Sequence, residues 1–170
     1  MTFFKAVTMF APLLEAPAQV WVDLIAHLRA QGAGVRESGA FLLGHKSEGR
    51  RVATCFLPYE QLQADALHDD YVALSATSFS KLWELCRSNG VAVVADVHTH
   101  RFGPGQSRSD RANPMVALKG HVALIVPRFA QGTVCLQDLG LYIYEGEHKW
   151  TSFLGSDVGR LMRLIEVGAT

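Results

Sequence analysis

Several features that would assign this sequence to a large functional class are missing from it. Its 16 Lys and Arg residues are balanced by 16 Asp and Glu residues, and no cluster of basic residues is present. A protein that neutralises phosphates needs such a basic face, so nucleic acid is not an expected partner. The three cysteines, Cys55, Cys86 and Cys135, are far apart and form no C-x-x-C pair. Neither a disulfide framework nor a thiolate zinc site is indicated, which suggests buried thiols in a reducing compartment.

Long apolar runs are also absent. No stretch approaches the ~20 apolar residues that cross a bilayer. Residues 1–14 are apolar with Lys5 as the only basic side chain, but the Ala16-Pro17-Ala18 sequence fits a cleavage site poorly. We therefore predict a first strand at residues 3–10 and a cytoplasmic protein with no membrane partner.

The length and composition indicate one folded domain spanning residues 1–170. With 49% hydrophobic residues, the chain can form one substantial core. Apolar residues recur at helical spacing from Val20 to Leu28, and Gly32 and Gly34 end that helix. The other predicted helices cover residues 79–87, 114–119 and 156–166. The other predicted strands cover residues 36–44, 52–57, 71–76, 91–98, 122–126, 133–137, 139–145 and 149–153. This order predicts an α/β or α+β domain with a central mixed sheet flanked by helices.

The most informative stretch runs from Val91 to Asp110. It begins with an apolar run typical of a buried strand, and His98 and His100 follow at its end. Residues two apart in a strand point to the same face, about 6.6 Å apart, so both imidazoles can reach one ion. Asp110 returns from the following loop as a possible third ligand. Two histidines and an aspartate leave one zinc coordination position open, as in catalytic sites.

Each part of this pattern also has an ordinary explanation. Ser107-Arg-Ser-Asp110 fits a helix capping box, and His-x-His occurs by chance in many strands. The polar run His68-Asp69-Asp70 is most simply a solvated loop. However, neither a capping box nor a buried strand requires two histidines, because an unpartnered buried imidazole is costly. Glu37, at the start of a separate strand, becomes a candidate functional residue when it is considered together with the two histidines and Asp110.

Together these residues resemble the JAMM motif of the MPN-type metallopeptidases. The resemblance rests on Glu37, on the pair His98-Thr-His100 and on the run Ser107-Arg-Ser-Asp110. The run that begins at Glu37, Glu-Ser-Gly-Ala-Phe-Leu-Leu-Gly, is similar to the glutamate strand of the family. The likeness covers roughly residues 3 to 130 and is strongest to bacterial members. Arg101 stands where many members have proline, and the spacer before Ser107 is one residue shorter than in many members.

The resemblance implies an MPN or cytidine-deaminase-like layered fold and a site with defined roles. Zn²⁺ would be held by His98, His100 and Asp110, with water as the fourth ligand. Glu37 would act as general base and then as general acid, and Ser107 would donate a hydrogen bond to the oxyanion. Asp96, two residues before His98, is either an outer residue that orients this histidine or a structural residue.

The resemblance further implies an isopeptidase or peptidase that cleaves after the C-terminal tail of a ubiquitin-like protein. Segments 58–70 and 101–106 are candidate walls of the channel for that tail. Partners would be the ubiquitin-like protein, its conjugates and E1-like and E2-like proteins of the same operon, including operons of antiphage defence. The alternatives are a peptidase that acts on a sulfur-carrier protein and a non-catalytic MPN-type scaffold. A zinc deaminase is disfavoured, because no P-C-x-x-C motif is present.

Overall fold

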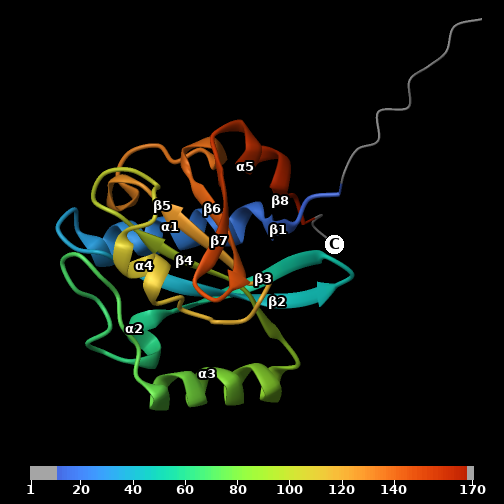
Figure 1. Cartoon of the computed structure of the whole chain (residues 1–170), viewed down its shortest axis with the longest axis horizontal. Coiled ribbons are helices and arrows are strands. Elements are labelled where there is room, and N and C mark those ends of the chain that lie inside the picture. The colour runs from blue at the N-terminus through green and yellow to red at the C-terminus, as the bar shows by residue number, and fades with distance from the viewer. Residues whose placement is uncertain (1–10, 168–170) are drawn as a thin grey trace, which may run out of the picture.

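The computed structural model describes residues 11–167, which form one eight-stranded sheet with helices on both faces (Figure 1). The strands are β1 (Leu14–Pro17), β2 (Gly39–Ser47), β3 (Arg50–Pro58), β4 (Ala92–Thr99), β5 (Val122–Val126), β6 (Gly140–Gly146), β7 (Lys149–Leu154) and β8 (Met162–Ile165). The helices are α1 (Ala18–Gly32), α2 (Tyr59–Leu62), α3 (Ala76–Asn89), α4 (Arg108–Ala112) and α5 (Ser156–Leu161). Short 3-10 turns lie at Arg128–Ala130 and Leu136–Asp138. The expected mixed α/β architecture is confirmed.

The strand order is β7-β6-β5-β4-β2-β3-β1-β8, with parallel and antiparallel pairs. Hairpins β2–β3 and β6–β7 are antiparallel, whereas β4 pairs with β5 in parallel and with β2 antiparallel. The central strand β4 is almost wholly buried, and β5 is wholly buried. The predicted burial of these two strands on both faces is therefore confirmed.

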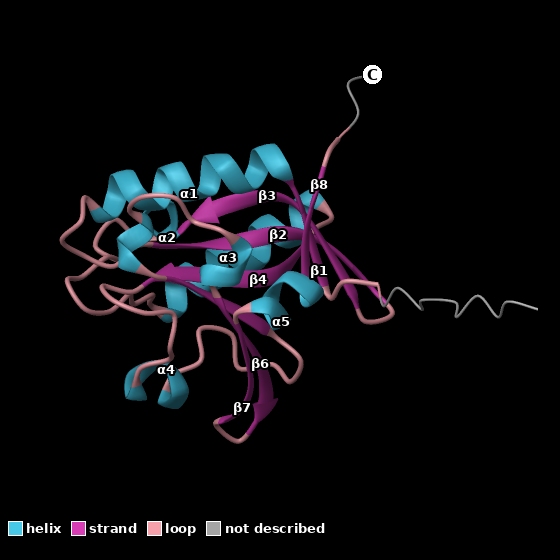
Figure 2. Ribbon diagram, turned by 90° about the horizontal axis from the view of Figure 1, so that it is seen from above, coloured by secondary structure: helices cyan, strands magenta, loops and turns pink. Residues whose placement is uncertain are grey.

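Alternating residues of β2 pack into two separate cores. Ala40 and Leu42 contact the core formed with α1, whereas Phe41 and Leu43 contact the core formed with α2 and α3. The helices α1 and α3 accordingly lie on opposite sides of the β2–β3 hairpin (Figure 1), and α1 runs along the length of β3 when the molecule is turned (Figure 2). The sheet thus holds β4 between two layers of helices. None of the helices in residues 11–167 has the length and apolar character needed to span a bilayer.

Two predicted strands are wrong. In residues 71–76, only an isolated bridge between Leu67 and Val72 forms, because this loop folds back on itself rather than beside a sheet edge. Residues 133–137 contain instead the start of the Leu136–Asp138 turn, where the Asp138 carboxylate accepts a hydrogen bond from the Cys135 amide. In both segments apolar side chains reach a core without strand pairing.

Two predicted helices also require correction. The chain is helical before Asn113 rather than after it: α4 begins at the capping box of Ser107, and the Asn113 amide donates to the Ser109 carbonyl at its end. The last helix stops at Leu161, and residues 162–165 form β8, which pairs in parallel with β1. The strand predicted at residues 3–10 lies outside the described residues.

Glu15 joins three strands at this edge of the sheet, and its removal should give a pH-dependent loss of stability. Its side chain is 1% exposed and accepts hydrogen bonds from Arg50 of β3 and Arg163 of β8. The hydrogen bond from Arg50, helped by that from Arg163, outweighs burial and lowers the pKa of Glu15. A carboxyl group whose pKa is lower in the folded than in the unfolded state stabilises the fold at pH values above the unfolded-state pKa. This stabilisation is lost as the pH falls through the folded-state pKa.

We therefore expect Glu15→Gln to reduce the free energy of unfolding by about 2 kcal/mol at neutral pH. Urea denaturation of both proteins between about pH 7 and about pH 3 measures the difference. The two stabilities should converge as the wild-type carboxylate becomes protonated. A difference that stays constant over this range would contradict the assigned ion pairs.

Candidate metal centre

Both histidines lie at the carboxyl end of β4, at the centre of the sheet. His98 is 6% exposed, and its Nε2 lies 3.0 Å from Nε2 of His100. The backbone of His100 is fixed on both sides, because its amide donates to the Val126 carbonyl and its carbonyl accepts from the Phe129 amide. The predicted convergence of the two imidazoles is therefore present, and β5 and the following turn support it.

Asp110 is oriented toward the histidines by the capping box of α4. The Ser107 amide donates to Asp110 Oδ2 at 2.6 Å, and the Asp110 amide donates to Ser107 Oγ at 3.1 Å. Asp110 Oδ1 lies 3.5 Å from His98 Nε2, and Oδ2 lies 3.2 Å from His100 Nε2. The capping box and the approach to the histidines thus occur together. The Ser107 hydroxyl accepts in the cap, so its own hydrogen is free to be donated elsewhere.

These three side chains have the spacing of metal ligands. Zinc bonds of about 2.0–2.1 Å to nitrogen and oxygen place two ligands of a tetrahedron about 3.3–3.4 Å apart. The two histidine nitrogens are 3.0 Å apart, and Asp110 lies 3.5 Å from His98 through Oδ1 and 3.2 Å from His100 through Oδ2, so separations that involve both carboxylate oxygens bracket that edge length. Nitrogen and carboxylate donors of this kind suit zinc. The geometry and the chemistry of the donors therefore fit a zinc ion.

Glu37 reaches the same point from the segment before β2. Its Oε1 lies 3.9 Å from His100 Nε2, and the residue is 7% exposed. One atom from each of Glu37, His98 and His100 falls within 4.8 Å of the others, so this trio is itself a group that could hold a metal ion. Asp110 is closer than Glu37 to His100, which favours Asp110 as the third ligand and Glu37 as a neighbour of the ion.

Hydrogen bonds between Ser38 and Thr99 fix Glu37 relative to the histidines. The Ser38 amide donates to Thr99 Oγ1 at 3.0 Å, and the Thr99 amide donates to the Ser38 carbonyl at 2.9 Å. Both residues are fully buried, and Ser38 Oγ also donates to the Leu28 carbonyl of α1 at 2.8 Å. Since Ser38 follows Glu37 and Thr99 separates the histidines, strand pairing sets the distance between Glu37 and the two histidines.

Burial and charge act in opposite directions on the titrating groups of the site. Burial raises the pKa of Glu37 above its ordinary value, although the neighbouring histidines counteract this. Burial alone would lower the pKa of His98, but the carboxylates of Asp110 and Asp96 raise it to about 10. Burial would raise the pKa of Asp110, but hydrogen bonds from His100 and His98 outweigh this effect and lower that pKa.

Gly39 permits β2 to pack closely beside Tyr59, and a larger residue there should destabilise the fold. A Cβ at this position would lie 2.3 Å from the Tyr59 ring and 2.8 Å from the Val97 carbonyl oxygen. A glycine within a strand often marks the close approach of another backbone, and the Val97 carbonyl of β4 makes that approach here. We expect Gly39→Ala to cost about 1–3 kcal/mol in a urea titration.

Gly103 provides the matched control for this substitution. A Cβ there would have no neighbour within 4 Å, so Gly103→Ala should change stability by about 0.5 kcal/mol or less. Equal stabilities for the two variants would contradict the close packing at Gly39.

A hollow of about 390 Å³ opens beside the metal centre. It is lined by Glu37, His100, Arg101, Phe102, Gly103, Gly105 and Ser107. The loop 101–106, a predicted channel wall, therefore borders the site, whereas segment 58–70 does not line this hollow. Tyr142 holds the loop in place by donating to the Pro104 carbonyl at 2.6 Å. Phe102 is 80% exposed at the rim.

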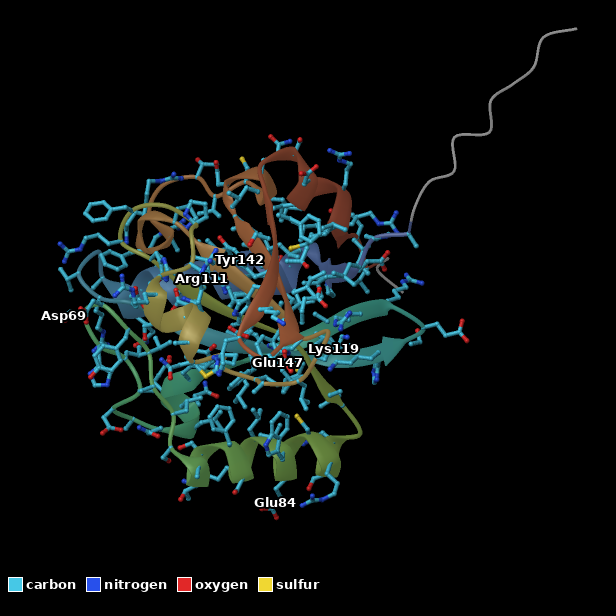
Figure 3. The ribbon with its side chains drawn as sticks, viewed as in Figure 1. Asp69, Glu84, Arg111, Lys119, Tyr142 and Glu147 are labelled. Atoms are coloured by element: carbon cyan, nitrogen blue, oxygen red, sulfur yellow. The ribbon has the colours of Figure 1, made fainter. Side chains whose placement is uncertain are left out.

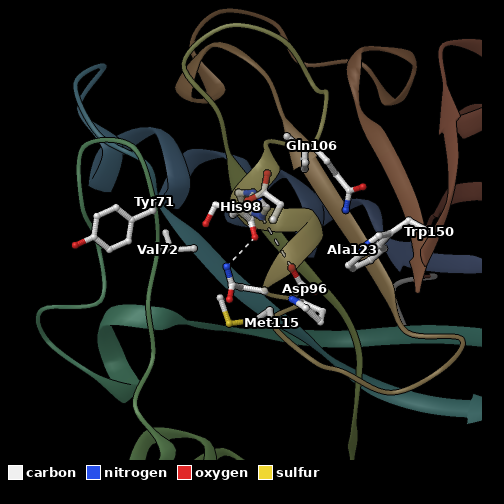
Figure 4. Close-up of a pocket in the computed structure, with 13 residues that line it drawn as sticks. Tyr71, Val72, Asp96, His98, Gln106, Met115, Ala123 and Trp150 are labelled. Carbon is white, nitrogen blue, oxygen red and sulfur yellow. Dashed lines mark hydrogen bonds and ion pairs between the residues drawn. The ribbon is translucent and has the colours of Figure 1, made fainter. Parts of the chain in front are cut away.

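A second, smaller cavity of about 70 Å³ lies on the other side of His98 (Figure 4). His98 and Asp96 form its wall from β4, and Tyr71 and Trp150 bound it from two sides. Asp96 accepts a hydrogen bond from His121 Nε2 at 2.7 Å. No local sequence pattern indicates the His121 contact, because 25 residues separate the partners.

The structure thus brings together all five residues singled out from the sequence: Glu37, His98, Ser107, Asp110 and His100. The loop run His68-Asp69-Asp70 is not part of this cluster. His68 stacks on Tyr71 with ring centres 4.1 Å apart, and Asp69 lies at the outer edge of the molecule (Figure 3).

No family model matches this chain. Among solved structures, the solution structure of protein DSY2949 from Desulfitobacterium hafniense is similar, with a TM-score of 0.67. The match covers 91% of this chain and 94% of that chain at 14% sequence identity. A likeness at this level of identity extends to the fold alone.

Proposed function

We propose that this protein is a zinc-dependent isopeptidase or peptidase of the JAMM type, with an MPN-like layered fold. The observation that carries the proposal is the convergence of His98, His100 and Asp110, with Glu37 3.9 Å from one of the histidines. A buried carboxylate beside a three-ligand site supplies the proton acceptor that hydrolysis requires. The resemblance of the motif to that family supports the same reaction class.

The proposed ligands are His98, His100 and Asp110, whose separations fit a tetrahedral ion. A bound zinc ion supplies Lewis-acid activation of water and of a carbonyl at neutral pH. Glu37 takes a proton from the attacking water and returns it to the leaving amine. The carboxylate lines the hollow beside His100, from which the substrate would approach.

Ser107 has a free hydroxyl hydrogen beside the site. Because the Asp110 carboxylate is bonded by the Ser107 amide rather than by its hydroxyl, both interactions can exist at once. We assign the hydroxyl to the oxyanion of the tetrahedral intermediate, where a donor gains strength as charge develops.

The proposed substrate is an amide or isopeptide bond after the extended, glycine-rich tail of a ubiquitin-like protein. The hollow beside Glu37 is bordered by two glycines of the loop 101–106, which leave room for a peptide backbone. A tail of small residues would fit there without a deep side-chain pocket. E1-like and E2-like proteins are the corresponding candidate partners.

The test is incubation of the zinc-loaded full chain with a ubiquitin-like protein fused through its terminal glycine to a reporter. We expect cleavage after that glycine, loss of cleavage with a chelator and recovery on addition of zinc. Mass spectrometry of the products identifies the bond. Zinc binding without hydrolysis of linear and isopeptide-linked fusions would instead indicate a metal-binding scaffold.

A further inference from the structure

Asp96 and His121 form a buried polar pair directly behind the metal centre. Asp96 is 2% exposed and His121 is 3% exposed, and Asp96 Oδ1 lies 2.7 Å from His121 Nε2. Burying a carboxylate and an imidazole is unfavourable unless their hydrogen bonds are satisfied. The sheet does not need this pair, because backbone bonds already join β4 to β5 with Asp96 opposite Ala123. The pair therefore calls for an explanation beyond strand pairing.

The second carboxylate oxygen of Asp96 faces the metal centre. Its Oδ2 lies 4.0 Å from Nδ1 of His98, the nitrogen opposite to the one that approaches His100 and Asp110. This separation exceeds a direct hydrogen bond. The cavity of about 70 Å³ that both residues line has room for a water that joins them. The contacts thus run in succession from His121 to Asp96 and from Asp96 to His98, which is one of the proposed metal ligands.

A carboxylate at Nδ1 decides which nitrogen of His98 can bind a metal. A neutral imidazole carries one proton, and the nitrogen without it provides the lone pair. A carboxylate beside Nδ1 favours a proton on that nitrogen and leaves the lone pair on Nε2, which faces the other ligands. His121 donates to Oδ1 and thereby keeps Oδ2 directed toward His98.

We propose that Asp96, held by His121, is a positioning residue that fixes the ring orientation and the tautomer of His98 for metal binding. This inference rests on the metal centre of the proposed function. Removal of a residue that orients a metal-binding histidine typically lowers metal affinity by about 10–100-fold.

The experiment measures zinc affinity of the full chain by competition with a chromogenic chelator, together with thermal unfolding of each metal-free protein. Asp96→Asn keeps the shape but can present an amide N–H to Nδ1, which would move the His98 proton to Nε2. We expect its zinc affinity to fall by about 10–100-fold. His121→Phe should also weaken binding, and His121→Gln should weaken it less, because its amide still donates to Asp96.

Glu15→Gln is the matched control, since it makes the same carboxylate-to-amide change at a buried site on β1 away from the metal centre. It should leave zinc affinity unchanged even if it lowers the unfolding temperature. Wild-type affinity in both Asp96→Asn and His121→Phe would overturn the positioning role alone. Should Asp96→Asn fail to fold, equal affinities of wild type, His121→Phe and His121→Gln would overturn it. A wild-type protein that binds no zinc would overturn the metal centre as well.

Discussion

Replacing Glu37 with glutamine should reduce kcat/KM for cleavage by about 10²–10⁴-fold while zinc remains bound. Glutamine has nearly the same shape, but its amide cannot accept a proton from water. The structure places Glu37 Oε1 at 3.9 Å from His100 Nε2, farther than Asp110 Oδ2 at 3.2 Å. In the proposed mechanism, this greater distance from His100 is the reason for assigning Glu37 as the proton acceptor and Asp110 as the third ligand.

Two measurements on Glu37→Gln separate these roles. Zinc content by elemental analysis should match that of the wild type, and the cleavage rate of the fusion substrate should fall. Loss of zinc would show that Glu37 belongs to the ligand trio with His98 and His100, which its distances also permit. Wild-type activity would reject Glu37 as the base.

Replacing His98 with alanine should weaken zinc binding by about 100-fold or more, since loss of an outer partner alone costs about 10–100-fold. His98 contributes an almost fully buried nitrogen 3.0 Å from His100 Nε2. Removing it leaves two of the three proposed ligands. Activity should be lost in parallel, because the same ion serves the reaction.

The control for this variant is His45→Ala, which removes an exposed histidine on β2. Zinc stoichiometry of that protein should equal that of the wild type. If His98→Ala retained wild-type zinc content, the ligand assignment would be wrong, and the metal would have to be sought elsewhere.

Features that depend on neighbours in sequence were predicted well. The apolar run before His98 specified a buried strand, and the Ser107–Asp110 spacing specified a capping box that the structure contains. Two strands were also predicted at residues 36–44 and 52–57, where β2 and β3 lie. In each case, the signal is a pattern of residue types within a few consecutive positions, which is visible in the printed sequence.

Features that depend on distant pairing were missed. Val158, Leu161, Met162 and Ile165 continue a helical spacing, yet the chain becomes extended at Met162 because β1 offers a free edge for parallel pairing. That edge is further fixed by Glu15 and Arg163, which are 148 residues apart. The His121–Asp96 contact was missed for the same reason, because no local signal marks a bond between β4 and the residue that precedes β5. The helix or strand propensity of a segment does not indicate which strand of the sheet that segment will pair with.

The hydrogen bonds between Ser38 and Thr99 make the position of Glu37 independent of the loop that borders the hollow. They couple Glu37 to the histidines through adjacent strands, independently of the loop 101–106. Under the proposed function, the loop 101–106 could therefore change in sequence, and with it the substrate tail that the hollow admits, without moving Glu37 or the histidines. A change of substrate would then require substitutions in this loop, while the paired strands β2 and β4 kept their positions.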